Sequence, residues 1–226
     1  HATSKIDDAE DLLRVSTLGF RGEALASISS VSQLEMVTKT RNELMGCRYE
    51  ADGGKERTLE AVGCPDGTTI LVRNLFFNTP ARLKSSPTEA RYINTLIERL
   101  ALSHPDISFR FINQNQTKLH TSGNGNLKDV IYHIYGKDIT SNLLEVDASE
   151  VSCQVKGFIG KPIISRGNRN YMNYFINGRY IKSSTIHKAI EDAYQPYTMQ
   201  HRYPFTVLHF TVAPELVDIN VHPQKM

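Results

Sequence analysis

The segment Gly19-Phe20-Arg21-Gly22 is the part of the chain whose residues are best suited to bind an anion. It comes directly before a predicted helix over residues 23–30, so the unpaired N–H groups of the first helical turn lie next to it. These N–H groups, the helix dipole and the guanidinium of Arg21 favour a phosphate, and Glu23 in the first turn complements the dipole. The segment has neither the Gly-Lys-Ser/Thr of a P-loop nor the preceding strand of a dinucleotide-binding unit. Its spacing alone is therefore consistent with a phosphate site or with an ordinary turn.

A second candidate is the stretch from Val151 to Ile190, which contains seven Lys or Arg and no Asp or Glu. In a chain with 26 basic and 24 acidic residues, such a stretch can form a basic surface for phosphates. It can equally form a solvated face whose charges pair with acids elsewhere. Its aromatic residues can stack on nucleic acid or alternate into the core of a strand: Tyr171, Tyr174, Phe175 and Tyr180.

Composition excludes several other classes of protein. The chain has 226 residues, of which 40% are hydrophobic and 22% charged, as in ordinary globular domains. No stretch approaches the roughly 18 apolar residues of a membrane span, and the polar opening indicates no signal peptide. Three widely spaced cysteines argue against a disulfide framework or zinc site and favour a reducing compartment: Cys47, Cys64 and Cys153. The histidines match no ligand spacing and are interpreted as surface or satisfied structural residues: His187, His209 and His222.

The elements that must position these residues alternate between strands and helices. Alternating or β-branched segments predict strands at 34–40, 47–51, 59–62, 68–72, 107–112, 118–121, 143–146, 151–159, 171–176 and 206–212. Helical periodicity and caps predict helices at 23–30, 88–103, 127–135 and 184–193. The Gly- and Asn-rich linker 122–126 places a domain boundary between residues 122 and 123. Antiparallel strands interrupted by long helices indicate an α+β fold.

Four motifs, in order, resemble the MutL family of DNA mismatch repair ATPases: residues 1–6, 19–28, 67–82 and 217–225. The segment Phe175-Ile176-Asn177-Gly178-Arg179 is also similar to the family's second domain. The resemblance covers all 226 residues. A related ATPase, such as a type II topoisomerase subunit, fits less well because Gly19 to Leu25 is similar to the MutL lid.

The resemblance implies a fold and a function. Residues 1–122 would form part of a GHKL-type ATPase α/β sandwich, its lid-side half, and residues 123–226 a ribosomal-protein-like βαβ transducer domain. The intact protein would be an ATP-switched coordinator that dimerises on ATP binding, binds DNA and couples mismatch detection to strand processing. Implied cofactors and partners are ATP, Mg²⁺, DNA, a second MutL subunit (the same chain, or a different one in a eukaryote) and a MutS-type mismatch-recognition protein. The implied location is the cytoplasm, or the nucleus of a eukaryote, without a membrane partner.

The resemblance also implies roles for individual residues. The implied ATP-phosphate ligands are Gly19, Arg21, Gly22 and Lys225. The implied lid or adenine-pocket residues are Thr3, Ser4, Lys5, Thr68 and Thr69. Within the basic stretch, the DNA-binding candidates are Arg166, Arg169, Arg179 and Lys182.

The family's general base, its magnesium-binding asparagine and its adenine-reading aspartate precede the His-Ala-Thr-Ser-Lys motif, at which this chain begins. No catalytic residue and no metal ligand is therefore assigned within the chain. We expect a truncated fragment that does not hydrolyse ATP by itself, since hydrolysis needs a positioned base and a metal. Whether the 226 residues alone bind ATP stays open. The alternative for the fragment is a non-catalytic DNA-binding or protein-interaction module.

Overall fold

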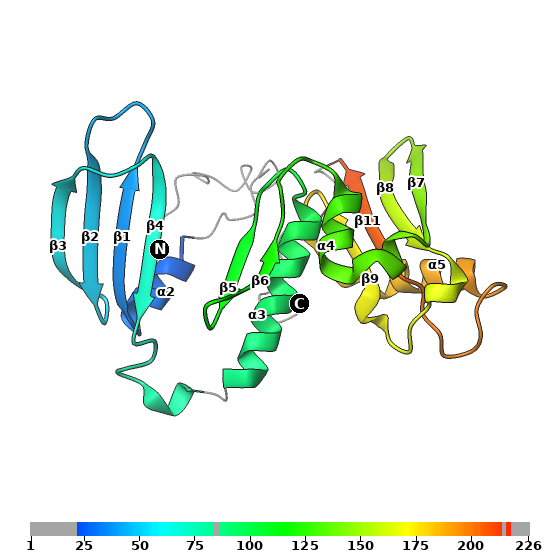
Figure 1. Cartoon of the computed structure of the whole chain (residues 1–226), viewed down its shortest axis with the longest axis horizontal. Coiled ribbons are helices and arrows are strands. Elements are labelled where there is room, and N and C mark those ends of the chain that lie inside the picture. The colour runs from blue at the N-terminus through cyan, green and yellow to red at the C-terminus, as the bar shows by residue number, and fades with distance from the viewer. Residues whose placement is uncertain (1–21, 84–85, 214–215, 218–226) are drawn as a thin grey trace. The chain divides into compact units, whose positions relative to one another are not determined.

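A computed structural model describes residues 22–83, 86–213 and 216–217 (Figure 1). The chain divides into two compact units: among the described residues, 22–83 belong to unit 1 and those from 86 onward to unit 2. This division lies between residues 85 and 86 and so precedes the boundary predicted at 122/123. The compact units are defined by the contacts within each of them. This division does not test the domain boundary at 122/123, which stays a prediction.

Unit 1 is an antiparallel four-stranded sheet with the strand order β3-β2-β1-β4 (Figure 1). Its strands are β1 Gln33–Lys39, β2 Gly46–Asp52, β3 Lys55–Val62 and β4 Gly67–Arg73. Helix α2, Ala24–Ser30, contacts β1 and β2, and the short 3-10 helix η1 covers Pro80–Arg82. Leu34 and Ala51, which face each other across β1 and β2, are buried, so the apolar face of this sheet is the one that carries them.

Unit 2 contains a five-stranded sheet with the order β10-β9-β11-β8-β7. These strands are β7 Leu143–Glu150, β8 Cys153–Gly160, β9 Met172–Ile176, β10 Arg179–Tyr180 and β11 Thr206–Val212. The remaining elements are α3 Ser86–Ser103, α4 Leu127–Thr140, α5 Ser184–Tyr194, the hairpin β5 Arg110–Asn113 with β6 Gln116–His120, and the 3-10 helices η2 Pro162–Ile164 and η3 Arg169–Tyr171. Strands β9 and β11 run parallel with α5 between them in the chain, which gives the predicted βαβ unit.

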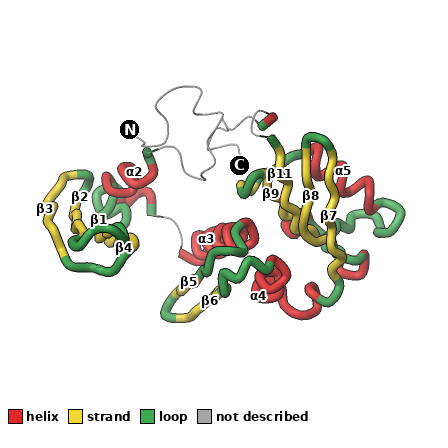
Figure 2. Tube along the Cα trace, turned by 90° about the horizontal axis from the view of Figure 1, so that it is seen from above, coloured by secondary structure: helices red, strands yellow, loops and turns green. Residues whose placement is uncertain are grey.

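The two faces of this sheet pack against different helices (Figure 2). On one face, Phe175 and Val207 join the core that α3 and α4 complete with Leu102 and Ile131. On the other face, the hydroxyl of Tyr174 accepts a hydrogen bond from the Ser183 N–H at 2.6 Å and donates to the Ser183 carbonyl at 3.0 Å. Because side chains alternate across a strand, the neighbouring β9 residues Tyr174 and Phe175 pack on opposite faces of the sheet.

One local prediction is confirmed and another is wrong. Gly136 was expected to end its helix, and it does interrupt the helical backbone with φ 80° and ψ −179°; α4 reaches Thr140 because a second helical segment follows this kink. Glu23 was expected within the first turn of α2. It is instead the N-cap, and its carbonyl accepts the first helical hydrogen bond from the Ser27 N–H at 3.0 Å. A capping residue lies outside the helical turn, so its carboxylate is not part of that turn.

Candidate functional site

Most of the predicted nucleotide ligands lie outside the described residues: Thr3, Ser4, Lys5, Gly19, Arg21 and Lys225. Of the phosphate-binding segment, the structure describes Gly22, which is exposed and comes just before the N-cap of α2. The roles of all these residues stay predictions.

Thr68 and Thr69, the predicted pocket residues, are adjacent on β4 and face opposite sides of the sheet. Thr68 pairs in register with Thr38, and their hydroxyl oxygens are 2.8 Å apart. Because Thr38 is four residues after buried Leu34 on the same strand, both hydroxyls lie on the apolar face. Thr69 pairs with Val37 and so lies on the other face. A pocket over one face of the sheet can therefore be lined by only one of these two threonines.

The face that carries Thr69 is covered with ion pairs across the strands. Glu35 accepts from Arg73 at 3.0 Å and from Arg48 at 3.0 Å, and the hydrogen bond from Arg73 lowers the pKa of Glu35. Arg48 also contacts Glu50 at 2.8 Å. This arrangement is a charged, solvated sheet surface, and the apolar face with Thr68 is the better candidate for an adenine-binding surface.

The charges of the basic stretch are partly neutralised by acids outside it. Arg169 donates from Nε and Nη2 to the two carboxylate oxygens of Glu191, at 2.5 and 3.0 Å. Lys156 lies 3.4 Å from Asp147, its register partner on the neighbouring strand. For these two cations, the structure supports the interpretation that they pair with acids elsewhere.

Two of the four predicted DNA-binding cations meet at the same tyrosine. Arg166 and Tyr203 exchange backbone hydrogen bonds at 2.8 and 2.7 Å, and the guanidinium of Arg169 lies 4.7 Å from the ring centre of Tyr203. Lys182 directly precedes Ser183, the N-cap of α5. Burial lowers the pKa of His187; the charges of Arg169 and Lys182 lower it further, and that of Glu191 opposes them. The structure therefore brings Arg166 and Arg169 into one neighbourhood and places Lys182 at the start of α5.

The fourth cation, Arg179, has a different setting. It lies on β10, which contacts α3, and partial burial lowers its pKa. A partly buried guanidinium contributes to packing as well as to charge. The role of Arg179 in DNA binding stays a prediction.

The aromatic residues of the basic stretch divide between core and surface. Tyr174 and Phe175 are 1% and 0% exposed, so the core interpretation is correct for them. Tyr171 and Tyr180 are half-buried, and each ring is covered by a guanidinium, from Arg166 at 5.3 Å and from Arg99 at 4.0 Å.

His209 is a buried structural histidine, as predicted, but it is satisfied only in part. Its ring stacks on Phe175 with centres 4.9 Å apart. Burial lowers its pKa, and a backbone hydrogen bond with Leu102 opposes this shift. Its Nε2 is buried and has no hydrogen-bond partner among the described residues. Over all the residues that the structure describes, no group of three or more potential metal ligands comes together.

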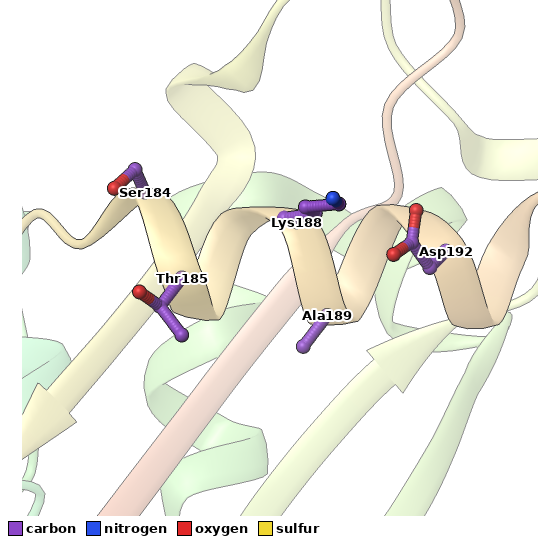
Figure 3. Close-up of a pocket in the computed structure, with 5 residues that line it drawn as sticks. All are labelled: Ser184, Thr185, Lys188, Ala189 and Asp192. Carbon is purple, nitrogen blue, oxygen red and sulfur yellow. The ribbon is translucent and has the colours of Figure 1, made fainter.

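An open groove of about 380 Å³ lies along the exposed side of α5, and Figure 3 shows the side chains that line it. Its lining residues are Ser184, Thr185, Lys188, Ala189 and Asp192. They come from a single helix, so the groove does not gather chemical groups from several elements as an enclosed ligand site does. No helix within the described ranges has the length and apolar character needed to cross a membrane.

Comparisons of sequence relate the chain to mismatch repair proteins. A family model described as the C-terminal domain of DNA mismatch repair proteins matches residues 131–226. The whole chain is 62% identical to the DNA mismatch repair protein MutL of Agathobacter rectalis and covers 35% of it. It is 42% identical to that of Caldanaerobacter subterraneus and covers 39%. The chain thus spans little more than a third of these relatives.

Comparisons of structure give the same relation. The N-terminal domain of a DNA repair protein matches with a TM-score of 0.76 and 27% identity, over 94% of this chain and 70% of that one. The Aquifex aeolicus MutL ATPase domain complexed with ADP matches with 0.67 and 27%, over 92% and 76%. The gyrase B subunit of Myxococcus xanthus, 12% identical with a TM-score of 0.55, shares the fold over 99% of this chain and 72% of that one. These likenesses confirm the predicted α+β fold of the GHKL class.

Proposed function

The chain belongs to the MutL family of DNA mismatch repair proteins, and we propose that it is part of an ATP-switched coordinator of that repair. The observation that carries the proposal is the 62% identity to a MutL protein along the entire chain. The likeness to an ATPase domain complexed with ADP supports nucleotide binding by the intact protein. In such a switch, ATP acts by favouring one conformation over another.

For the nucleotide site, we assign phosphate contacts to Gly19, Arg21, Gly22 and Lys225, with Mg²⁺ beside the phosphates. Thr3, Ser4 and Lys5 belong to the lid. Thr68, on the apolar face of unit 1, is assigned to the adenine pocket. ATP hydrolysis is assigned to the intact protein, because it needs a general base and a metal ligand that the sequence pattern does not locate in residues 1–226.

The proposed partners are DNA, a second MutL subunit joined on ATP binding, and a MutS-type mismatch-recognition protein; the proposed location is the cytoplasm. Arg166 and Arg169 support DNA binding because both contact Tyr203 in unit 2, and Lys182, just before the N-cap of α5, is proposed to join them. Cations on one surface bind the phosphate backbone irrespective of sequence. DNA binding without catalysis is therefore the second candidate function for these 226 residues taken alone.

The nucleotide proposal is tested with the full-length protein by light scattering and an ATPase assay. We expect ATP to convert monomers to dimers, with turnover that residues 1–226 alone do not show. Lys225→Ala should weaken the nucleotide-dependent dimer, whereas Lys188→Ala, at an exposed lysine on α5, should not. A full-length protein that stays monomeric with ATP, or equal turnover in both chains, would contradict the proposal.

A further inference from the structure

The setting of Arg169 differs from that of a free DNA-binding cation. Its side chain is 52% exposed, while that of the paired Glu191 is 27% exposed. Nε and Nη2 both donate to that carboxylate, and the guanidinium lies over the ring of Tyr203 at 4.7 Å. Two of its donors and one of its faces are therefore already occupied.

A carboxylate and a DNA phosphate compete for the same edge of an arginine. Both anions accept two parallel N–H hydrogen bonds from a guanidinium. A phosphate that approached Arg169 would have to displace Glu191 or bind the remaining edge against the repulsion of its carboxylate. While the pair is closed, its net charge is zero, so it adds little to the attraction for a polyanion.

We propose that Glu191 masks Arg169 and thereby sets how strongly unit 2 binds DNA. The inference rests on the DNA binding proposed above and specifies its regulation: α5 carries a built-in competitor for one of the DNA-binding cations. Opening the pair adds one positive charge beside Arg166, whose backbone pairs with Tyr203, the residue under the Arg169 guanidinium. Glu191 acts through Arg169 and is a positioning residue, not a DNA contact.

The test is a double-mutant cycle in the full-length protein with Glu191→Gln, Arg169→Gln and both together. Asp192→Asn is the matched control: it removes the same charge one position along α5, and no described residue forms a salt bridge with it. Binding to a duplex of about 30 base pairs is measured by fluorescence anisotropy between about 50 and 200 mM salt, because each phosphate contact contributes about 0.9 to the logarithmic salt slope. Tyrosine fluorescence checks that each variant is folded.

We expect Glu191→Gln to raise DNA affinity about tenfold at 50 mM salt and to steepen the salt slope by about 0.9, which is an extra loss of about 3.5-fold by 200 mM. Asp192→Asn should change both quantities much less. Arg169→Gln should lower affinity only modestly in the wild-type protein, through the repulsion of the Glu191 carboxylate that it leaves unpaired. In the Glu191→Gln background the same change should cost more, because it abolishes the gain.

Two results would overturn the inference by itself: equal effects of Glu191→Gln and Asp192→Asn, or the same loss from Arg169→Gln in both backgrounds. In either case wild-type binding would still support the proposed function. Absence of salt-dependent DNA binding in the wild type and in Glu191→Gln alike would refute the DNA-binding proposal, and the masking inference with it.

Discussion

Replacing Asn177 should destabilise unit 2 by an amount that depends on the residue introduced. Asn177 and Gly178 form the turn between β9 and β10, with φ angles of 48° and 77°. The Asn177 side chain donates from Nδ2 to the Val212 carbonyl at 2.9 Å and accepts from the Val212 N–H at 3.0 Å. It thereby holds the end of β11 against the turn.

The magnitudes follow from these two features. Asn177→Gly keeps the left-handed backbone but removes two hydrogen bonds worth about 0.5–1.5 kcal/mol each, so we expect a loss of about 1–3 kcal/mol. Asn177→Ala removes the same hydrogen bonds and adds the left-handed penalty of about 1–2 kcal/mol. The lower backbone entropy of unfolded alanine offsets about 0.5–1 kcal/mol of that penalty. The Asn177→Ala variant should therefore be less stable than the Asn177→Gly variant by roughly 1 kcal/mol.

Urea unfolding followed by tyrosine fluorescence measures the effect. The chain has no Trp, and of its 10 Tyr only Tyr49 lies in unit 1, so the signal reports unit 2. Gln114→Gly is the control, because Gln114 has a similar φ of 49° in another turn. It should cost far less than Asn177→Gly. Equal stability of the two Asn177 variants would refute the backbone argument, and wild-type stability of Asn177→Gly would refute the hydrogen-bond argument.

Two further predictions concern nucleotide binding and pH. In the full-length protein, Thr68→Val should weaken ATP binding about fivefold, because it removes one hydrogen bond worth about 1 kcal/mol. Thr69→Val should leave ATP binding unchanged. Isothermal titration calorimetry measures both affinities, and the opposite order would assign the pocket to the other face of the sheet. Burial lowers the pKa of His209 below its usual 6.5, so the folded state keeps the ring neutral while the unfolded state takes up a proton. The contribution of the neutral His209 to the free energy of unfolding should be fully present above pH 6.5. It should be lost as the pH falls towards the folded pKa, by at most about 1.4 kcal/mol per pH unit. His209→Phe should flatten this part of the profile in urea titrations, and an unchanged slope would show that other groups cause it.

The strands with strong side-chain patterns were predictable from the sequence. β11 has the predicted bounds, Thr206–Val212, because its β-branched and aromatic residues favour an extended backbone. β7 was predicted to end at residue 146 but continues to Glu150. Its second half is polar and exposed at the edge of the sheet, where hydrogen bonds to β8 extend the strand without an apolar pattern to reveal it.

The nucleotide residues were assigned from a resemblance to a family, and their spacing alone did not identify them. Alternation along β4 could nevertheless have shown that Thr68 and Thr69 face opposite sides. The sequence could not show which side is apolar, because that depends on the pairing of Leu34 with Ala51 from another strand. The unpaired nitrogen of His209 was unpredictable for the same reason, since its surroundings come from Phe175 and α3.

The acid-free stretch shows what a linear count of charges leaves out. Its seven cations include Lys156, whose partner Asp147 follows from the register of β7 with β8. The partner of Arg169 lies on α5, just beyond the end of the stretch, and only the three-dimensional fold brings the two together. Removing these two pairs leaves at most five cations for phosphates. At about 0.9 per contact, the salt slope that this stretch contributes is then at most about 4.5 instead of about 6.3, and one of the two missing contacts returns whenever Glu191 releases Arg169.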